Sequence, residues 1–147
     1  MNGPSRHLTW AELGCWNRLP RTFEGAAPGE RIEAYPMAWR DTRATPLADT
    51  FEEIRAALGA APVRVQSAYR TVRYNAAVGG VDASQHTQGR ALDIVHSAIL
   101  PRRLFEEIFR LYKSGDLAHL GGLGSYKGFV HIDVRPRVGT RLPVWHY

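Results

Sequence analysis

The sequence has few of the features that build disulfide-bonded or membrane-spanning proteins. Its 147 residues include a single cysteine, Cys15, which excludes an intramolecular disulfide and any zinc site built on several cysteines. No stretch approaches the roughly 20 apolar residues that a membrane span needs. A metal site in this chain must therefore draw its ligands from histidine, aspartate and glutamate.

The N-terminal residues also lack the apolar segment of a secretory signal peptide. Between Met1 and Trp16 the chain carries Arg6, His7 and Glu12, and these charged and polar residues interrupt any such segment. We therefore expect synthesis in the cytoplasm without a signal peptide.

Runs of like charge are absent, although the chain is basic overall. It has 19 Lys and Arg against 14 Asp and Glu, a formal net charge of +5. Such a charge favours an anionic partner, for example nucleic acid, an acidic membrane or the bacterial cell wall. The basic residues are scattered, and no run of five or six marks a nucleic-acid-binding arm. Since net charge alone supports nucleic acid, we expect no nucleic-acid partner.

The apolar and aromatic content is typical of a folded protein. Hydrophobic residues make up 44% of the chain, with four Trp, six Tyr and five Phe, which is too large an apolar load for a disordered chain. Because the sequence has no internal repeat, its length predicts a single domain over residues 1–147.

Hydrophobic periodicity predicts a mixture of helices and strands. The predicted helices cover residues 9–16, 46–58, 71–78 and 101–112. The predicted strands cover residues 63–65, 90–95 and 129–134. Thr9 and Thr45 are expected to cap the first two helices. The elements do not alternate regularly, which predicts an α+β fold with a small antiparallel sheet flanked by helices.

Two further segments have no sustained periodicity. Residues 17–45 contain several prolines and glycines and are expected to form a long loop, either one wall of a cleft or a surface connection. Gly121, Gly122 and Gly124 are expected to form a tight turn before the last strand.

The first stretch with chemical content runs from residue 84 to 94, Ser-Gln-His-Thr-Gln-Gly-Arg-Ala-Leu-Asp-Ile. It places His86 in a polar turn and Asp93 within an otherwise apolar strand. A buried carboxylate is costly unless it is paired or bound to a metal. By itself this stretch suits two interpretations: a pair of metal ligands, or an aspartate that binds backbone amides beside a histidine with ordinary hydrogen bonds.

A second stretch, residues 129–135 (Phe-Val-His-Ile-Asp-Val-Arg), favours the metal interpretation. It alternates strictly, so its valines and isoleucine share one strand face while His131 and Asp133 share the other. Such a polar face suits the wall of a site better than the packing of a sheet. Together with His86 and Asp93, His131 would complete a set of two imidazoles and one carboxylate. That set suits Zn²⁺ with a fourth position open for water.

The sequence also resembles a known family, the zinc-dependent D-Ala-D-Ala carboxypeptidases and dipeptidases. The resemblance covers roughly residues 46–135 and rests on motifs in the right order: Ser67-Ala68-Tyr69-Arg70-Thr71, Tyr74-Asn75, Val78-Gly79-Gly80, Ser84-x-His86 followed by Asp93, and Phe129-Val130-His131-Ile132-Asp133. It implies the fold that these enzymes share with lysostaphin-type endopeptidases and the hedgehog signalling domain, a small antiparallel sheet flanked by helices.

The resemblance also implies the roles of individual residues. Zinc would be held by three ligands, His86, Asp93 and His131. Arg70 matches the arginine that steadies the scissile carbonyl in the family. Ser84 and Tyr69 would help to bind the substrate.

At one position the sequence departs from the family. Many members carry the general base, Glu or Asp, three residues before the last histidine ligand, where this chain has Gly128. Asp133 could serve as the base or could orient His131. The second role is favoured because side chains two apart on a strand project in parallel and meet poorly. Asp116, in a loop, is a further candidate, and the identity of the base stays open.

These observations predict a zinc-dependent peptidase that hydrolyses bonds of peptidoglycan stem peptides, either as a D-Ala-D-Ala carboxypeptidase or as an endopeptidase. The alternative is a non-catalytic, metal-containing module of the same fold that binds the cell wall, and the missing side chain at Gly128 favours it. We expect a monomer that acts at the bacterial cell wall, in the manner of a phage or prophage lysin.

Overall fold

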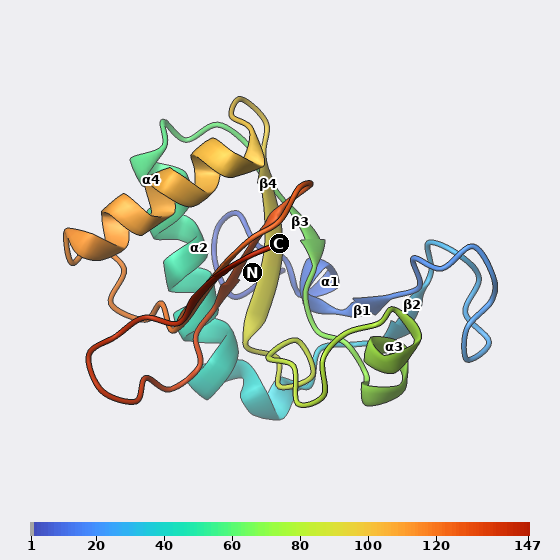
Figure 1. Cartoon of the computed structure of the whole chain (residues 1–147). Coiled ribbons are helices and arrows are strands. Elements are labelled where there is room, and N and C mark those ends of the chain that lie inside the picture. Colours follow the sequence, from blue (N-terminus) through green and yellow to red (C-terminus); the bar gives the residue numbers. More distant parts are fainter. Residues whose placement is uncertain (1) are drawn as a thin grey trace.

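The structure, a computed structural model, describes residues 2–147 and is built around a five-stranded sheet (Figure 1). The strand order is β3-β4-β6-β5-β7. The strands are β3 (Val63–Ser67), β4 (Ala91–His96), β5 (Gly122–Ser125), β6 (Val130–Asp133) and β7 (Val144–His146). Neighbours from β3 to β5 pair antiparallel, whereas β7 pairs parallel with β5. The predicted α+β fold is confirmed, with one parallel edge strand added to the antiparallel sheet.

Two helices cover one face of this sheet, α2 (Thr45–Ala57) and α4 (Pro101–Lys113) (Figure 1). Both were predicted from their apolar stripes. These stripes meet the apolar residues of β4 and β6 in one core, whose fully buried members include Leu47, Phe51, Ile54, Leu92, Ile94, Leu104, Ile108, Val130 and Ile132. Burial of a side chain of this size contributes about 1.5–3 kcal/mol, so this face is the main source of stability.

The pairing of β4 with β6 places the polar residues of both strands on the opposite face. Asp93 lies across from His131, and Leu92 lies across from Ile132. Because successive side chains on a strand point to opposite faces, the two apolar residues face the helices and the two polar residues share the uncovered side.

The glycine-rich segment forms strand β5, and its prediction as a tight turn is wrong. Glycine is needed in this strand because neighbouring side chains approach the backbone so closely that a Cβ would not fit. A Cβ on Gly122 would collide with the carboxylate of Asp133, and a Cβ on Gly124 would lie 2.5 Å from the indole nitrogen of Trp145. Strand β7, which carries this tryptophan, was also not predicted.

The N-terminal third is more ordered than the predicted loop. Helix α1 (Trp10–Leu13) has the capping box expected from Thr9 and Glu12, and a ribbon of β1 (Cys15–Trp16) and β2 (Arg31–Glu33) follows. Two helical turns, η1 (Met37–Trp39) and η2 (Arg40–Ala44), then lead directly into α2. Thr45 therefore does not cap α2, and its hydroxyl donates to the carbonyl of Arg40 instead.

The remaining helix, α3 (Val72–Ala77), begins after Thr71, whose hydroxyl accepts a hydrogen bond from the backbone of Tyr74. It precedes the loop that leads to His86. Within residues 2–147, no helix has both the length and the apolar character that a membrane crossing requires.

Candidate metal centre

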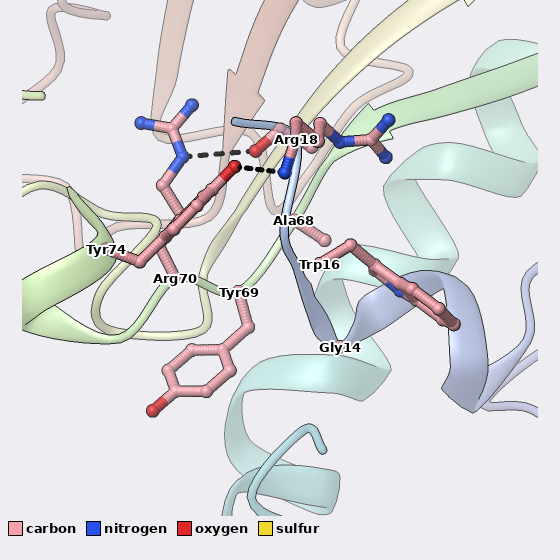
Figure 2. Close-up of a pocket in the computed structure, with 8 residues that line it drawn as sticks. Gly14, Trp16, Arg18, Ala68, Tyr69, Arg70 and Tyr74 are labelled. Atoms are coloured by element: carbon pink, nitrogen blue, oxygen red, sulfur yellow. Dashed lines mark hydrogen bonds between the residues drawn. The ribbon is translucent and has the colours of Figure 1, made fainter. Parts of the chain in front are cut away.

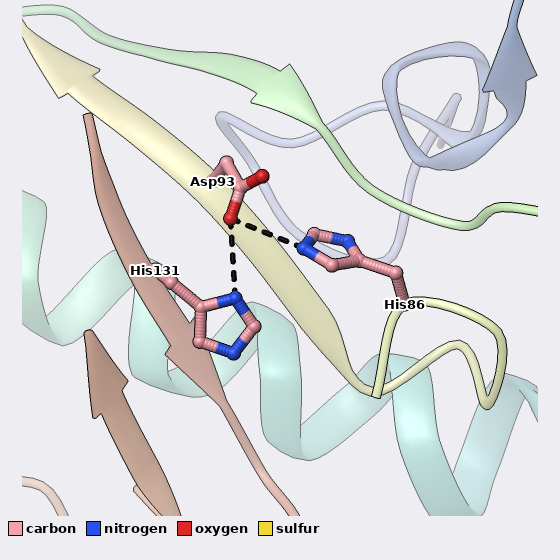
Figure 3. Close-up of side chains that lie close together, drawn as sticks. All are labelled: His86, Asp93 and His131. Carbon is pink, nitrogen blue, oxygen red and sulfur yellow. Dashed lines mark hydrogen bonds and ion pairs between the residues drawn. The ribbon is translucent and has the colours of Figure 1, made fainter. Parts of the chain in front are cut away.

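The three predicted metal ligands lie together on the uncovered face of the sheet. Figure 3 shows one carboxylate oxygen of Asp93 in contact with both imidazoles. This oxygen is 3.1 Å from Nε2 of His86 and 3.2 Å from Nδ1 of His131. The possible ligand atoms of the three residues all lie within 4.8 Å of one another. All three side chains are buried. The structure therefore brings together residues from two strands and one turn.

His86 is presented by a tight turn that precedes β4. The backbone of Thr87 donates to the carbonyl of Ser84, and the backbone of Gly89 donates to the carbonyl of His86. Gly89 has a φ of 66°, which favours glycine, and its carbonyl accepts the hydroxyl of Tyr35 at 2.7 Å. These contacts fix the turn, so the imidazole is held in place before any metal binds.

The hydrogen bonds of the two imidazoles define which nitrogen is free. Nδ1 of His86 donates to the carbonyl of Ala68 at 2.6 Å, and Nε2 of His131 donates to the carboxylate of Asp133 at 2.8 Å. A neutral imidazole has one N–H, so in each neutral ring the nitrogen that faces Asp93 carries a lone pair. Two lone pairs and a carboxylate oxygen at this separation repel one another unless a cation lies between them.

This donor set fits zinc. Neutral histidine nitrogens and a carboxylate oxygen are ordinary zinc ligands, and three protein ligands with an open fourth position are typical of catalytic zinc. Anchoring of the remote imidazole nitrogen by a carbonyl or a carboxylate is the usual support for such ligands. The geometry of His86, Asp93 and His131 meets both conditions.

The electrostatics of the group are set by the buried carboxylate of Asp93. Burial lowers the pKa of His86, although Asp93 opposes the shift. Burial alone would raise the pKa of Asp93, but the neighbouring His86 and the contact with His131 hold it well below its usual range. Burial would also lower the pKa of His131, but its bonds to Asp133 and Asp93 raise it. The group thus contains an ionised carboxylate and attracts positive charge.

Asp133 is fully buried and its two oxygens are occupied. They accept the backbone N–H, Nε and Nη2 of Arg135 at 3.1, 2.9 and 2.7 Å, in addition to Nε2 of His131. Burial would raise the pKa of Asp133, but these hydrogen bonds lower it to about 2. The expectation that His131 and Asp133 meet poorly is wrong, because the ring of His131 turns Nδ1 towards β4 and so directs Nε2 along its own strand.

Arg70 supports the other oxygen of Asp93. Its Nη2 donates to Asp93 at 3.2 Å, its Nε to Ser67 at 3.1 Å and its Nη1 to Asn75 at 3.3 Å. An arginine has five N–H donors. Part of the guanidinium therefore stays available beside His86, Asp93 and His131, which together are called the metal group.

Asn75 is a structural residue of the site, and no role was predicted for it beyond its place in the Tyr74-Asn75 motif. It is 4% exposed, accepts from Arg70 and donates to the carbonyl of Val81 at 2.9 Å. A Cβ on Gly80 would collide with its side chain. The signal in the sequence is an asparagine within a short helix followed by two glycines. The Asn75 side chain links α3 and the following loop to Arg70.

A cavity of about 560 Å³ opens over the metal group. Ser84, the predicted substrate-binding residue, lies on its wall, and the Ser84 hydroxyl oxygen accepts the backbone N–H of His86 at 3.2 Å. Sequence analysis missed several of the other lining residues, namely Asp82, Tyr126, Trp145 and Tyr147. The signals of the three aromatic residues are weak, since Trp145 lies on the short strand β7, and Tyr126 and Tyr147 lie just outside strands.

Tyr69 is not brought to this cavity. It lines a separate small pocket with Trp16 and Tyr74, where the backbone of Arg18 donates to the hydroxyl of Tyr74 at 2.8 Å (Figure 2). Adjacent residues of extended chain point in opposite directions, so Arg70 faces the metal group while Tyr69 faces away. The expected contact of Tyr69 with substrate has no support in this geometry.

The other two positions considered for the base also lie outside the group. Asp116 follows α4, is exposed, and lies near Glu53 of α2, on the helical side of the sheet. Gly128 lies in the exposed turn between β5 and β6, and a Cβ there would meet nothing within 4 Å. Neither lines the cavity.

Comparison with known families agrees with this geometry. The model of the Peptidase M15 family matches residues 6–133, a range that contains the metal group, Arg70 and strands β3 to β6. Strand β7 lies beyond the matched range. The comparison with curated proteins gives no match. The chain belongs to the Peptidase M15 family, whose members include D-Ala-D-Ala carboxypeptidases with a hedgehog-like fold.

Proposed function

We propose that the protein is a zinc-dependent peptidase that hydrolyses peptide bonds of bacterial peptidoglycan stem peptides. One observation carries the proposal: both imidazoles have their remote nitrogen anchored, which leaves two lone pairs directed at the ionised Asp93. Family membership supports the peptidase activity. The net charge of +5 suits an anionic cell wall, and we propose that the protein acts there as a monomeric phage or prophage lysin.

The residues around the metal group have distinct tasks in this mechanism. His86, Asp93 and His131 would hold the zinc, which would supply a water of lowered pKa and a Lewis acid for the amide carbonyl. Arg70 uses its remaining N–H donors to stabilise the negative charge that develops on the carbonyl oxygen. Ser84 retains its O–H for a substrate oxygen because its own oxygen accepts from His86. Asp133 holds His131 in the orientation that ligation needs.

The proton acceptor is a carboxylate on the cavity wall. Within residues 2–147, the carboxylates that line the cavity are Asp93, which belongs to the metal group, and Asp82, which is exposed. Asp133 is sequestered by Arg135 and does not line it. We therefore propose Asp82 as the general base, in place of the side chain that Gly128 lacks.

A cell-wall-binding module without hydrolysis is the second candidate, and Gly128 is the observation that favours it. The two are separated by measuring zinc content and turnover on the same sample. We expect about one zinc per chain and shortened muropeptides, detected by mass spectrometry after digestion of isolated peptidoglycan. Zinc without shortened muropeptides would identify the binding module. Protein that takes up no zinc from supplemented buffer would contradict both functions.

A further inference from the structure

One wall of the cavity is aromatic, and part of it comes from β7, outside the range matched by the family model. Trp145 on β7 lies beside Gly124 on β5 in the strand register. Because glycine leaves space there, the indole packs over the strand, and its ring centroid lies 5.1 Å from that of His131. Trp145 is thus a direct neighbour of a metal ligand.

The indole N–H fixes the direction of a second group, the hydroxyl of Tyr126. Nε1 of Trp145 donates to the hydroxyl oxygen of Tyr126 at 3.0 Å. An indole nitrogen only donates, so the tyrosine oxygen is the acceptor and its own O–H must point to another partner. Within residues 2–147 no side chain or carbonyl accepts that O–H, and Tyr126 lines the cavity.

The ring of Tyr126 is held on both sides. It stacks on Phe129 with a centroid distance of 4.5 Å and on Tyr147 with a centroid distance of 4.9 Å. Stacked aromatic pairs contribute about 0.5–1.5 kcal/mol beyond their buried area. Burial raises the pKa of Tyr126, although the bond from Trp145 opposes the shift, so the hydroxyl stays protonated at neutral pH. A donor that is protonated and fixed in direction needs no rearrangement when an acceptor arrives.

We propose that the Tyr126 hydroxyl donates a hydrogen bond to a main-chain carbonyl oxygen of the bound peptide, and that Trp145 is the positioning residue that directs it. The inference rests on the proposed peptidase function. It makes the aromatic wall a substrate-binding surface, so that a peptide in the cavity meets a neutral donor in addition to Arg70 and Ser84.

The test uses zinc-loaded protein and a synthetic stem pentapeptide that ends in D-Ala-D-Ala. Tyr126→Phe removes one hydroxyl and keeps the stacked ring, and we expect kcat/KM to fall about 5- to 10-fold, as for loss of one hydrogen bond. The Kd for the cleaved peptides of the wild-type digest should rise by a similar factor. Zinc content and Tm should not change.

Trp145→Phe keeps an aromatic ring over Gly124 but frees the tyrosine O–H to rotate. The kcat/KM of Trp145→Phe should fall less than that of Tyr126→Phe. The double variant should have the same kcat/KM as Tyr126→Phe, because Trp145 acts through Tyr126. Tyr112→Phe is the control, since the hydroxyl of Tyr112 on α4 lies 3.4 Å from the carbonyl of Thr140, outside the cavity.

Three results would overturn the inference. A kcat/KM of Tyr126→Phe within two-fold of the wild-type value would show that the hydroxyl makes no hydrogen bond to the substrate. Losses of zinc or Tm in proportion to activity would make the hydroxyl structural. If the loss of kcat/KM in the double variant were the product of the losses in the two single variants, Trp145 would act independently of Tyr126. Failure of the wild type to cleave would instead refute the peptidase function, and the Kd of Tyr126→Phe for the intact pentapeptide would still decide the role of the hydroxyl.

Discussion

On one face of the central strands, Leu92 and Ile132 are fully buried among the apolar residues of α2 and α4. On the other face, Asp93 and His131 are almost as buried, at 3% and 6% exposure, but among charged and polar partners. The same two strands therefore carry a packing face and a chemical face. Replacing a buried side chain therefore has a different consequence on each face. A substitution on the packing face loses packing energy, whereas a substitution on the chemical face loses a candidate metal ligand.

The largest effect is expected from the chemical face. His131→Ala and His86→Ala should each abolish zinc binding and reduce turnover by more than about 10³-fold, because the proposed mechanism depends on a zinc-bound water. Leu92→Ala is the matched change on the packing face, where we expect a loss of about 2–5 kcal/mol in stability with zinc still bound. Metal analysis and denaturant unfolding measure the two effects. If His131→Ala still bound a full equivalent of zinc, the distinction between the packing face and the chemical face would not hold.

Arg70 lies at the boundary of the chemical face, and its loss should come next. Arg70→Ala should lower turnover by about 10²- to 10³-fold, the usual cost of one transition-state donor, while zinc stays bound at saturating metal. Kinetics at rising zinc concentration measure this. If activity returned to wild-type levels as zinc was added, Arg70 would serve only to hold Asp93.

Two carboxylates near the site should behave differently. Asp82→Asn should keep zinc affinity and lower the rate by about 10²-fold, as for loss of a general base. Asp133→Asn should weaken zinc affinity by about 10- to 100-fold and spare turnover at saturating metal, as for loss of a group that orients a ligand. Zinc titrations combined with rate measurements distinguish them. The reverse pattern would make Asp133 the base, and Asp116→Asn serves as the distant control.

The smallest effect is expected far from both faces. Thr9→Ala removes the side chain that caps α1, and we expect a loss of about 1 kcal/mol in stability with unchanged zinc content and turnover. Denaturant unfolding at saturating zinc measures it. A change in activity would mean that the N-terminal segment supports the cavity more directly than its contacts indicate.

The parts of this structure that follow from local sequence were predicted well. The alternation around His131 and the isolated carboxylate at Asp93 predicted which residues meet as candidate metal ligands, because the two-residue period of a strand is visible in a few residues. Helices α2 and α4 followed from their apolar stripes in the same way. The capping box of Thr9 was also correct, since its partner is only three residues away.

The parts that depend on distant partners were not predicted. The glycines of β5 suit a turn equally well, and only the contacts of Gly122 with Asp133 and of Gly124 with Trp145 explain a strand there. Thr45 looked like a cap because η2 has no periodic signal. The direction of Tyr69 depends on the extended backbone between β3 and α3, which the residue types do not specify.

The partners of the metal group also have a consequence for its charge balance. Asp93 and Asp133 are ionised, and each is paired with a guanidinium, that of Arg70 and that of Arg135. These four charges cancel, and Asp82 adds one negative charge on the cavity wall, so a bound dication would leave the cavity with a net charge of about +1, apart from any hydroxide. A stem peptide is rich in carboxylates, and it would meet this excess charge at the base of a cavity in a protein that is already basic.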